Sequence, residues 1–183
     1  MKKRVIHISS YLVFCAMLFS CVNDLDTIKR VTFDPSSPDD VTENLEIIQT
    51  DSGYAKFQLF AKIAETYSKP EPLTKLKDGI KVNFFSKEGK IVSTLTALYG
   101  EINMVKGTFF VRDSVQLFNL EKKERLETEE LFCTMKDSSV YTDKSVIVKT
   151  PQGILFGNGI RTKLDFSKYV FLKPTGKIDF DKK

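Results

Sequence analysis

The chain has 183 residues, with 28 basic and 24 acidic side chains and a net charge of +4 at neutral pH. Three of the basic residues, Lys2, Lys3 and Arg4, stand at the N-terminus, and without them 25 basic residues face 24 acidic ones. This balance, without a Lys/Arg stripe, argues against a nucleic-acid-binding protein. The single histidine is His7, so the rest of the chain offers no histidine for acid–base catalysis, a His-activated nucleophile or a usual zinc site. We predict no metal and no cofactor.

The N-terminal residues predict a secretory signal peptide over residues 1–20. Three positive charges precede Val5–Phe19, which is almost wholly apolar. This stretch is shorter than the roughly 20 apolar residues that span a bilayer, and it fits the hydrophobic region of a signal peptide. It ends in Leu18-Phe19-Ser20-Cys21, which is similar to the bacterial lipobox. We therefore predict that Cys21 is lipidated and begins the mature chain. Such a cysteine would carry two or more acyl chains, and two chains give stable membrane anchoring. An uncleaved anchor, or a plain signal peptide with a chance cysteine, is the alternative.

Residues 21–50 are polar and acidic and are predicted to form a flexible tether. They include the cluster Pro35-Ser36-Ser37-Pro38-Asp39-Asp40, which disfavours regular structure. A short strand near Leu45–Ile48 is expected within this stretch, and a partner-binding arm is the alternative to a tether. Asp51-Ser52-Gly53 is a turn signal. It predicts the start of a folded domain over residues 51–175, followed by a tail over residues 176–183.

From Tyr54 onward, apolar residues alternate with polar ones. Ile80, Val82 and Phe84, for example, fall on one face of an extended segment. A period of two is typical of strands that are buried on one side. Turn signals separate the runs at intervals of about ten residues, which predicts an all-β sandwich or roll. The stretch Glu121–Leu131 is charged enough for a helix, but its neighbours favour a strand.

The inward-facing side chains of these strands are predicted to surround one apolar interior. They are Phe57, Leu59, Ile80, Val82, Phe84, Leu95, Ala97, Phe109, Val111, Val115, Leu117, Val140, Val146, Val148 and Ile160. Alternation alone favours a closed, dry core. A slightly open roll needs the same residues, and it would bind acyl chains with about 0.8 kcal/mol for each buried CH₂ group.

A weak internal repeat of about 30 residues accompanies the alternation. Thr94, Thr128 and Gly157 hold corresponding places, 34 and then 29 residues apart. Such a period predicts stacked hairpin-like units, because one unit cannot bury its own apolar face. An open stack leaves two edges, whose free backbone groups can pair with another chain.

Other residues offer chemistry only weakly. The glutamates at positions 127, 129 and 130 could suggest paired carboxylates for hydrolysis, but they fit a solvated strand face better. Cys133 is expected to pack as a small apolar side chain. Gly157 and Gly159 indicate a bulge or a close approach of the backbone rather than contact with lipid.

Several segments in sequence order resemble the lipopolysaccharide transport protein LptC family. Gln49–Phe57 with Leu59–Tyr67 is similar to the opening of the family's domain, and Lys77–Phe85, Gly89 and Ser93–Ala97 to its continuation. The later repeat is matched by Asp113–Val115, Leu126–Leu131 and Gly157–Ile160. The resemblance covers roughly residues 49–173, and it rests on the order and spacing of short motifs.

This resemblance implies a twisted, open β-jellyroll of stacked antiparallel strand pairs, with acyl chains of lipopolysaccharide in its interior. It implies a non-enzymatic component of lipopolysaccharide export. The domain would receive lipopolysaccharide from an inner-membrane ABC transporter and pass it to a periplasmic bridge protein of the same fold. The C-terminal edge is the expected partner edge, through Leu164, Phe166, Val170 and Leu172.

The implied location is the periplasm, at the inner membrane. Well-known family members carry an N-terminal transmembrane helix, whereas this chain carries the lipobox-like segment. An envelope lipoprotein with a closed core and a scaffolding role is the alternative function. A carbohydrate-active β-solenoid enzyme is disfavoured, because His7 is the chain's single histidine and no carboxylate pair is convincing.

Overall fold

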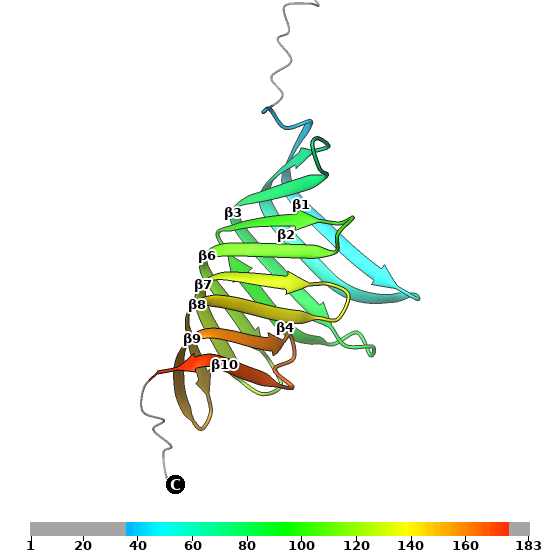
Figure 1. Ribbon diagram of the computed structural model, residues 1–183. Coiled ribbons are helices and arrows are strands. Elements are labelled where there is room, and N and C mark those ends of the chain that lie inside the picture. The colour runs from blue at the N-terminus through cyan, green and yellow to red at the C-terminus, as the bar shows by residue number, and fades with distance from the viewer. Residues whose placement is uncertain (1–35, 176–183) are drawn as a thin grey trace, which may run out of the picture. The chain divides into compact units, whose positions relative to one another are not determined.

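The computed structural model describes residues 36–175, and the regular secondary structure of this part consists of strands alone. Ten strands form one antiparallel sheet in the order β1-β2-β3-β4-β6-β7-β8-β9-β10, while β5 pairs with β3 and β6. They stack in chain order (Figure 1). Their bounds are β1 (Asp40–Asp51), β2 (Tyr54–Tyr67), β3 (Leu73–Phe85), β4 (Ile91–Ala97), β5 (Tyr99–Asn103), β6 (Thr108–Asn119), β7 (Glu124–Thr134), β8 (Ser139–Thr150), β9 (Gly153–Lys163) and β10 (Tyr169–Pro174). The predicted all-β class is confirmed.

Three of the predictions fall on residues that the structure does not describe. The signal peptide over residues 1–20 and the lipidated Cys21 precede the described range, and the tail over residues 176–183 follows it. Within residues 36–175, no helix is long and apolar enough to cross a membrane.

The sheet begins at Asp40, eleven residues before the predicted start of the domain. Strand β1 pairs along its length with β2, from Asp40 opposite Thr66 to Asp51 opposite Tyr54. Residues 40–50 therefore belong to the sheet and not to a tether, and the strand is longer than the expected Leu45–Ile48. The sequence conceals this because β1 is an edge strand, which tolerates polar residues. The strand expected within Glu121–Leu131 is confirmed as part of β7.

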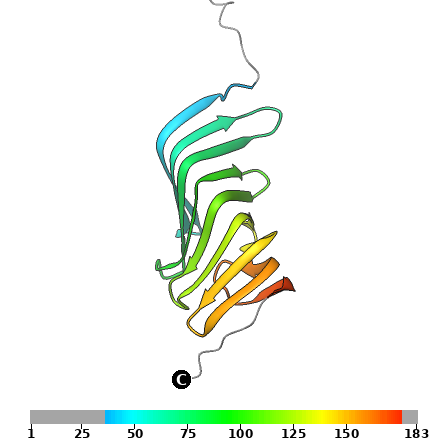
Figure 2. The ribbon, with the colours of Figure 1, turned by 90° about the vertical axis from the view of Figure 1, so that its left-hand side faces the viewer.

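Most of the long strands bend near their middle, where residues adopt left-handed backbone conformations. The φ angles are 52° at Asn44 in β1, 62° at Asp78 in β3, and 67° and 57° at Asp113 and Ser114 in β6. Asn and Asp tolerate this conformation better than other non-glycine residues, since their short polar side chains bond locally. The pairing of β6 with β7 shifts register here, between Arg112 and Val115. Figure 2 shows the strands turning through these corners.

The corners divide the sheet into two layers that enclose the core between them. Strand β3 pairs with β4 through residues 80–85 and with β5 through residues 74–76, so these two short strands lie in different layers. We therefore call the layers the β4 layer and the β5 layer; Leu98 lies between the two strands. The β4 layer contains residues 45–51, 54–61, 80–85, 91–97, 115–119, 124–128, 145–150 and 153–158. The β5 layer contains residues 40–43, 63–67, 74–77, 99–103, 108–112, 130–134, 139–142 and 160–163.

The outer face of the β5 layer carries a row of aromatic rings. The centroids of Phe110 and Phe132 are 4.7 Å apart, and those of Phe132 and Tyr141 are 5.2 Å apart. The guanidinium of Arg161 lies 5.8 Å from the centroid of Tyr141. The three aromatic residues are direct cross-strand partners on β6, β7 and β8. Such pairs stabilise a sheet by about 0.5–1.5 kcal/mol each, so this row is a structural feature of the layer.

Candidate functional site

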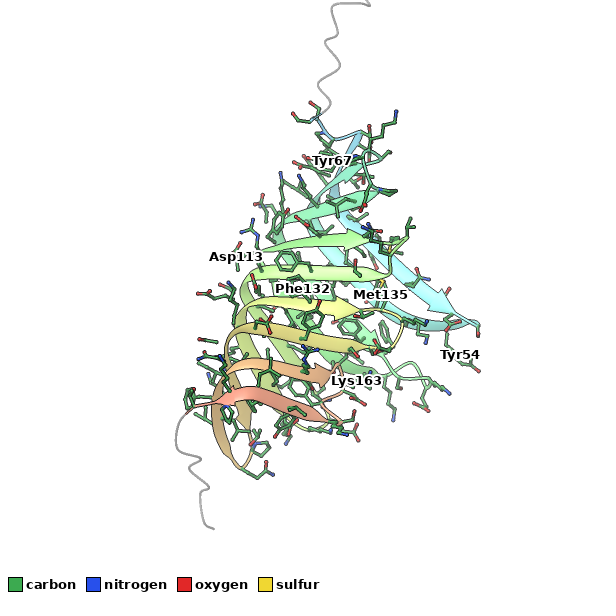
Figure 3. All side chains as sticks on the ribbon, viewed as in Figure 1. Tyr54, Tyr67, Asp113, Phe132, Met135 and Lys163 are labelled. Atoms are coloured by element: carbon green, nitrogen blue, oxygen red, sulfur yellow. The ribbon has the colours of Figure 1, made fainter. Side chains whose placement is uncertain are left out.

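The two layers separate on the side away from the corners and leave a groove of about 840 Å³. In Figure 3, Asp113 marks the corner side, whereas Met135 and Lys163, which both line the groove, lie on the opposite side. The β4 layer contributes Phe57, Leu59, Val82 and Phe84 to its walls, and the β5 layer contributes Ile102 and Phe109. The volume lies within the roughly 300–1,000 Å³ that is usual for ligand sites. The groove can therefore accept an apolar ligand of substantial size.

A single row of inward-facing side chains forms the lip of the β4 layer. Cross-strand pairing places them in the order Gln49, Phe57, Phe84, Ser93, Asn119 and Glu124. The phenylalanines on β2 and β3 line the groove, with ring centroids 6.4 Å apart. From β4 onward the row is polar, and there the connection between β9 and β10 crosses the mouth.

We call this connection, residues 164–168, the strap. Three of its backbone carbonyl groups accept hydrogen bonds from side chains of the β4 layer and its β6–β7 turn. The donors are Ser93 Oγ to Leu164 O at 2.5 Å, Asn119 Nδ2 to Asp165 O at 2.9 Å, and Lys122 Nζ to Phe166 O at 2.7 Å. Phe166 is only 2 % exposed and belongs to the hydrophobic core. The strap therefore closes the roll over β4 and β6. Its residues Leu164, Asp165 and Ser167 line the groove, whose wall in the β4 layer is formed mainly by β1–β3.

Two pairs of charged side chains lie at the rim of the groove. Lys163 Nζ donates to the Asp137 carbonyl oxygen at 2.6 Å and to Ser139 Oγ at 2.9 Å. Hydrogen bonds from Ser139 and then Lys163 lower the pKa of Asp137 to about 2. Lys56 Nζ lies 3.2 Å from an Asp51 carboxylate oxygen. Exposed pairs of this kind contribute at most about 1 kcal/mol each to stability, so they border the groove without giving it a strong charge.

The side chains that the sequence offered for nucleophilic or hydrolytic chemistry lie in the core or in ion pairs. Cys133 is a buried free thiol, and burial raises its pKa to about 12, so it is not a nucleophile at neutral pH. Glu127 forms ion pairs with Arg125 at 2.7 Å and with Lys149 at 3.0 Å. Among the described residues, no group of His, Cys, Asp or Glu side chains could hold a metal ion.

The fifteen predicted interior residues all lie in or against one core, and they divide into two sets. Fourteen are at most 8 % exposed, and Phe84 is half-buried. Those that line the groove are Phe57, Leu59, Val82, Phe84 and Phe109. Those that lie in the closed part of the core are Ile80, Leu95, Ala97, Val111, Val115, Leu117, Val140, Val146, Val148 and Ile160. The interior is thus open at one end and closed at the other.

The four predicted edge residues do not lie on one strand. Val170 and Leu172 are on the terminal strand β10 and are 53 % and 43 % exposed. Leu164 and Phe166 instead belong to the strap, so they do not take part in the edge. The reason is a turn at this point, in which the Phe166 amide donates to the Lys163 carbonyl at 3.0 Å and φ of Phe166 is 51°.

Ser93 and Asn119, which hold the strap, were not identified from the sequence as functional residues. Ser93 falls in register with Leu95 and Ala97 and is fully buried. A polar residue at an inward position requires a hydrogen-bond partner, and this is the signal that could have drawn attention to it. Ile102 and Met135 also line the groove, and neither was among the predicted interior residues.

The comparison with protein families agrees with this geometry. The family described as lipopolysaccharide-assembly, LptC-related matches residues 11–174. None of the curated proteins compared with the chain matches it. Members of the family take part in lipopolysaccharide transport as envelope components linked to the inner membrane and periplasm, and they are not known as enzymes. With most of its length matched, the chain belongs to the LptC-related family of lipopolysaccharide-assembly proteins.

Proposed function

We propose that the groove holds acyl chains of lipopolysaccharide while the molecule passes from an inner-membrane ABC transporter to a periplasmic bridge protein. The observation that carries this proposal is an apolar groove of about 840 Å³ that is continuous with the core and bordered by Phe57 and Phe84. Burying ten CH₂ groups of an acyl chain there would gain about 8 kcal/mol, at about 0.8 kcal/mol each. Retention of lipid therefore needs no covalent chemistry from the protein.

The terminal strand β10 offers the means of aligning two such domains. The Thr175 amide donates to the Phe156 carbonyl of β9, and the register of β10 with β9 continues without a shift from there to Tyr169. Because amides alternate in direction along an antiparallel strand, those of Val170 and Leu172 point away from β9. A strand of a similar roll can pair with this edge and continue the sheet. The ATP-driven transporter supplies the energy.

We also propose that the chain is held at the inner membrane, on the periplasmic side, by acyl groups on Cys21. Support comes from the lipobox-like residues 18–21 and from the family's link to the inner membrane. Cys21→Ser is expected to abolish labelling of the protein by a radioactive fatty acid and to release it from membranes. Persistent labelling of the variant would overturn the anchor at this residue.

A scaffold with a closed core is the second candidate. It is favoured by the ten interior residues that pack in the closed part of the roll. The two functions differ in one respect: a scaffold does not need a groove that is open to lipid.

Photo-crosslinking in living cells separates the two candidates. A photoreactive residue at Phe84, inside the groove, is expected to form adducts with lipopolysaccharide. The matched control is the same residue at Lys81, which lies on the same strand and is exposed. Absence of adducts at Phe84, in a protein that is folded and correctly located, would favour the scaffold.

A further inference from the structure

We propose that the strap occupies an acyl-chain subsite, with Phe166 in the place of the lipid. When the strap moves away, the groove extends beneath it toward β10. The inference rests on the proposed function, and it identifies a part of the lipid site that is covered in this structure.

The first argument is the continuity of the apolar wall beneath the groove and the strap. One step inward from the lip, cross-strand pairing joins Val82, Leu95, Leu117 and Leu126 in a single row. Val82 lines the open groove. Leu95 and Leu117 lie two residues inward from Ser93 and Asn119, which hold the strap. The same apolar wall therefore runs on beneath the strap, where the chain supplies its own phenylalanine.

The second argument concerns how the strap is held. The strap is attached to the β4 layer and its β6–β7 turn by side chains that donate hydrogen bonds to the strap's carbonyl groups, and not by strand pairing. The two bonds from neutral side chains contribute modestly to net stability, and the bond from the charged Lys122 side chain contributes more. An attachment of this kind can be released without breaking the sheet.

The third argument is that the closed arrangement contains an unfavourable backbone conformation. The φ of Phe166 is 51°, and this left-handed conformation is strained for a bulky residue. Movement of the strap would relieve this strain.

The position of the strap determines which parts of the roll become connected when the strap moves away. The strap connects β9 to β10, so its release joins the groove beside β1–β3 to the free edge at the other end of the sheet. Lipid held in the open half would then reach the strand that we propose aligns the bridge protein. The strap would thus control passage from one half of the roll to the other.

A tryptophan reporter tests the inference, because the chain contains no tryptophan. In a Phe166→Trp variant, adding purified lipopolysaccharide is expected to shift the emission to longer wavelength, since lipid displaces the indole from the core. The matched control is Phe110→Trp, on the outer face of the β5 layer, whose emission should not change. An unchanged spectrum for Phe166→Trp, while a photoreactive residue at Phe84 still forms adducts, would overturn the inference. Loss of adducts at Phe84 would instead overturn the proposed function.

A second measurement weakens the strap directly. Replacing Ser93 and Asn119 with alanine removes two of its bonds and should shift the strap toward the open state by on the order of tenfold. Lipopolysaccharide adducts at a photoreactive residue in place of Leu117 are then expected to increase, with those at Phe84 unchanged. The control double variant, Thr96→Ala and Gln116→Ala, changes a cross-strand pair on the same strands. Equal adducts at Leu117 in all three proteins would show that the strap does not cover a lipid subsite.

Discussion

Gly157 on β9 provides a sharp test of how the terminal strand is seated. A Cβ atom at this position would stand 2.5 Å from Cδ1 of Phe171 and 3.1 Å from the carbonyl oxygen of Lys173, both on β10. Gly157 is not among the residues with positive φ, so alanine fits its backbone conformation. The whole effect of Gly157→Ala should therefore come from the steric clash with β10.

The clash should cost about 1–3 kcal/mol, as other insertions into a packed interface do. Strand β10 pairs only with β9 in the described sheet, so it can relieve the clash by detaching. A loss of about 2 kcal/mol would increase the hydrogen-exchange rates of the β10 amides that face β9, such as Phe171 and Lys173, by about 30-fold. The midpoint of urea denaturation should fall as well.

A second substitution distinguishes a clash from a general disturbance. Phe171→Leu shortens the side chain that meets the new methyl group, so the double variant should lose less stability than the two single losses combined. The control is Gly107→Ala, which meets no atom within 4 Å but has a φ of 64°. It should lose about 1 kcal/mol for its backbone without faster exchange in β10. Unchanged exchange of the β10 amides in Gly157→Ala would refute the reasoning.

Three further outcomes are expected. Leu172→Pro removes an outward-facing amide at the free edge and should abolish pairing with the bridge protein in a pull-down, whereas Leu172→Ala keeps the amide and should bind. Asp113→Val should lower the unfolding free energy by at least about 1 kcal/mol, because valine strongly disfavours the corner's φ of 67°, while Asp113→Gly should be close to neutral. For Cys133, the raised pKa of about 12 keeps the folded thiol protonated while the unfolded thiol ionises from its usual value of 9.0. Its contribution to stability should then fall between pH 9 and 12, by up to about 1.4 kcal/mol per pH unit, and denaturation of Cys133→Ala should lack this part of the pH dependence.

The strands could be predicted from the sequence because each half of a strand, on either side of its corner, keeps a strict period of two. In β8, Val146 and Val148 face inward on one side of the corner and Val140 on the other. The corners were not predicted. Three consecutive exposed residues, such as residues 112–114 in β6, interrupt the alternation, and a local pattern does not distinguish such a break from a turn between two strands. The arrangement of the strand halves in two layers depends on long-range contacts, which the period of the local sequence does not reveal.

The site could be predicted only in part, for a related reason. Alternation identifies inward-facing residues, but it does not say which of them remain covered, so Phe57 in the groove and Leu117 in the closed core look alike. Leu164 and Phe166 have the spacing of a strand in register with Val170 and Leu172, which is why they were expected on the edge. The turn that separates them depends on the left-handed conformation of Phe166. Asp165 and Ser167 are turn-forming residues, and the Ser167 amide donates to Asp165 Oδ1 at 2.9 Å, but this signal was outweighed by the strand-like spacing.

The composition of the lip explains why the roll is open at one end only. On β2 and β3 the lip residues are Phe57 and Phe84, which offer no hydrogen bond to a crossing segment. On β4 and β6 the same row carries Ser93 and Asn119, whose side chains hold the strap. The change from Phe84 on β3 to Ser93 on β4 along this row thus sets the boundary between the open groove and the closed core. On the proposed function, lipid enters on the aromatic side without any change in the fold, and it reaches the C-terminal edge only when the polar side releases the strap.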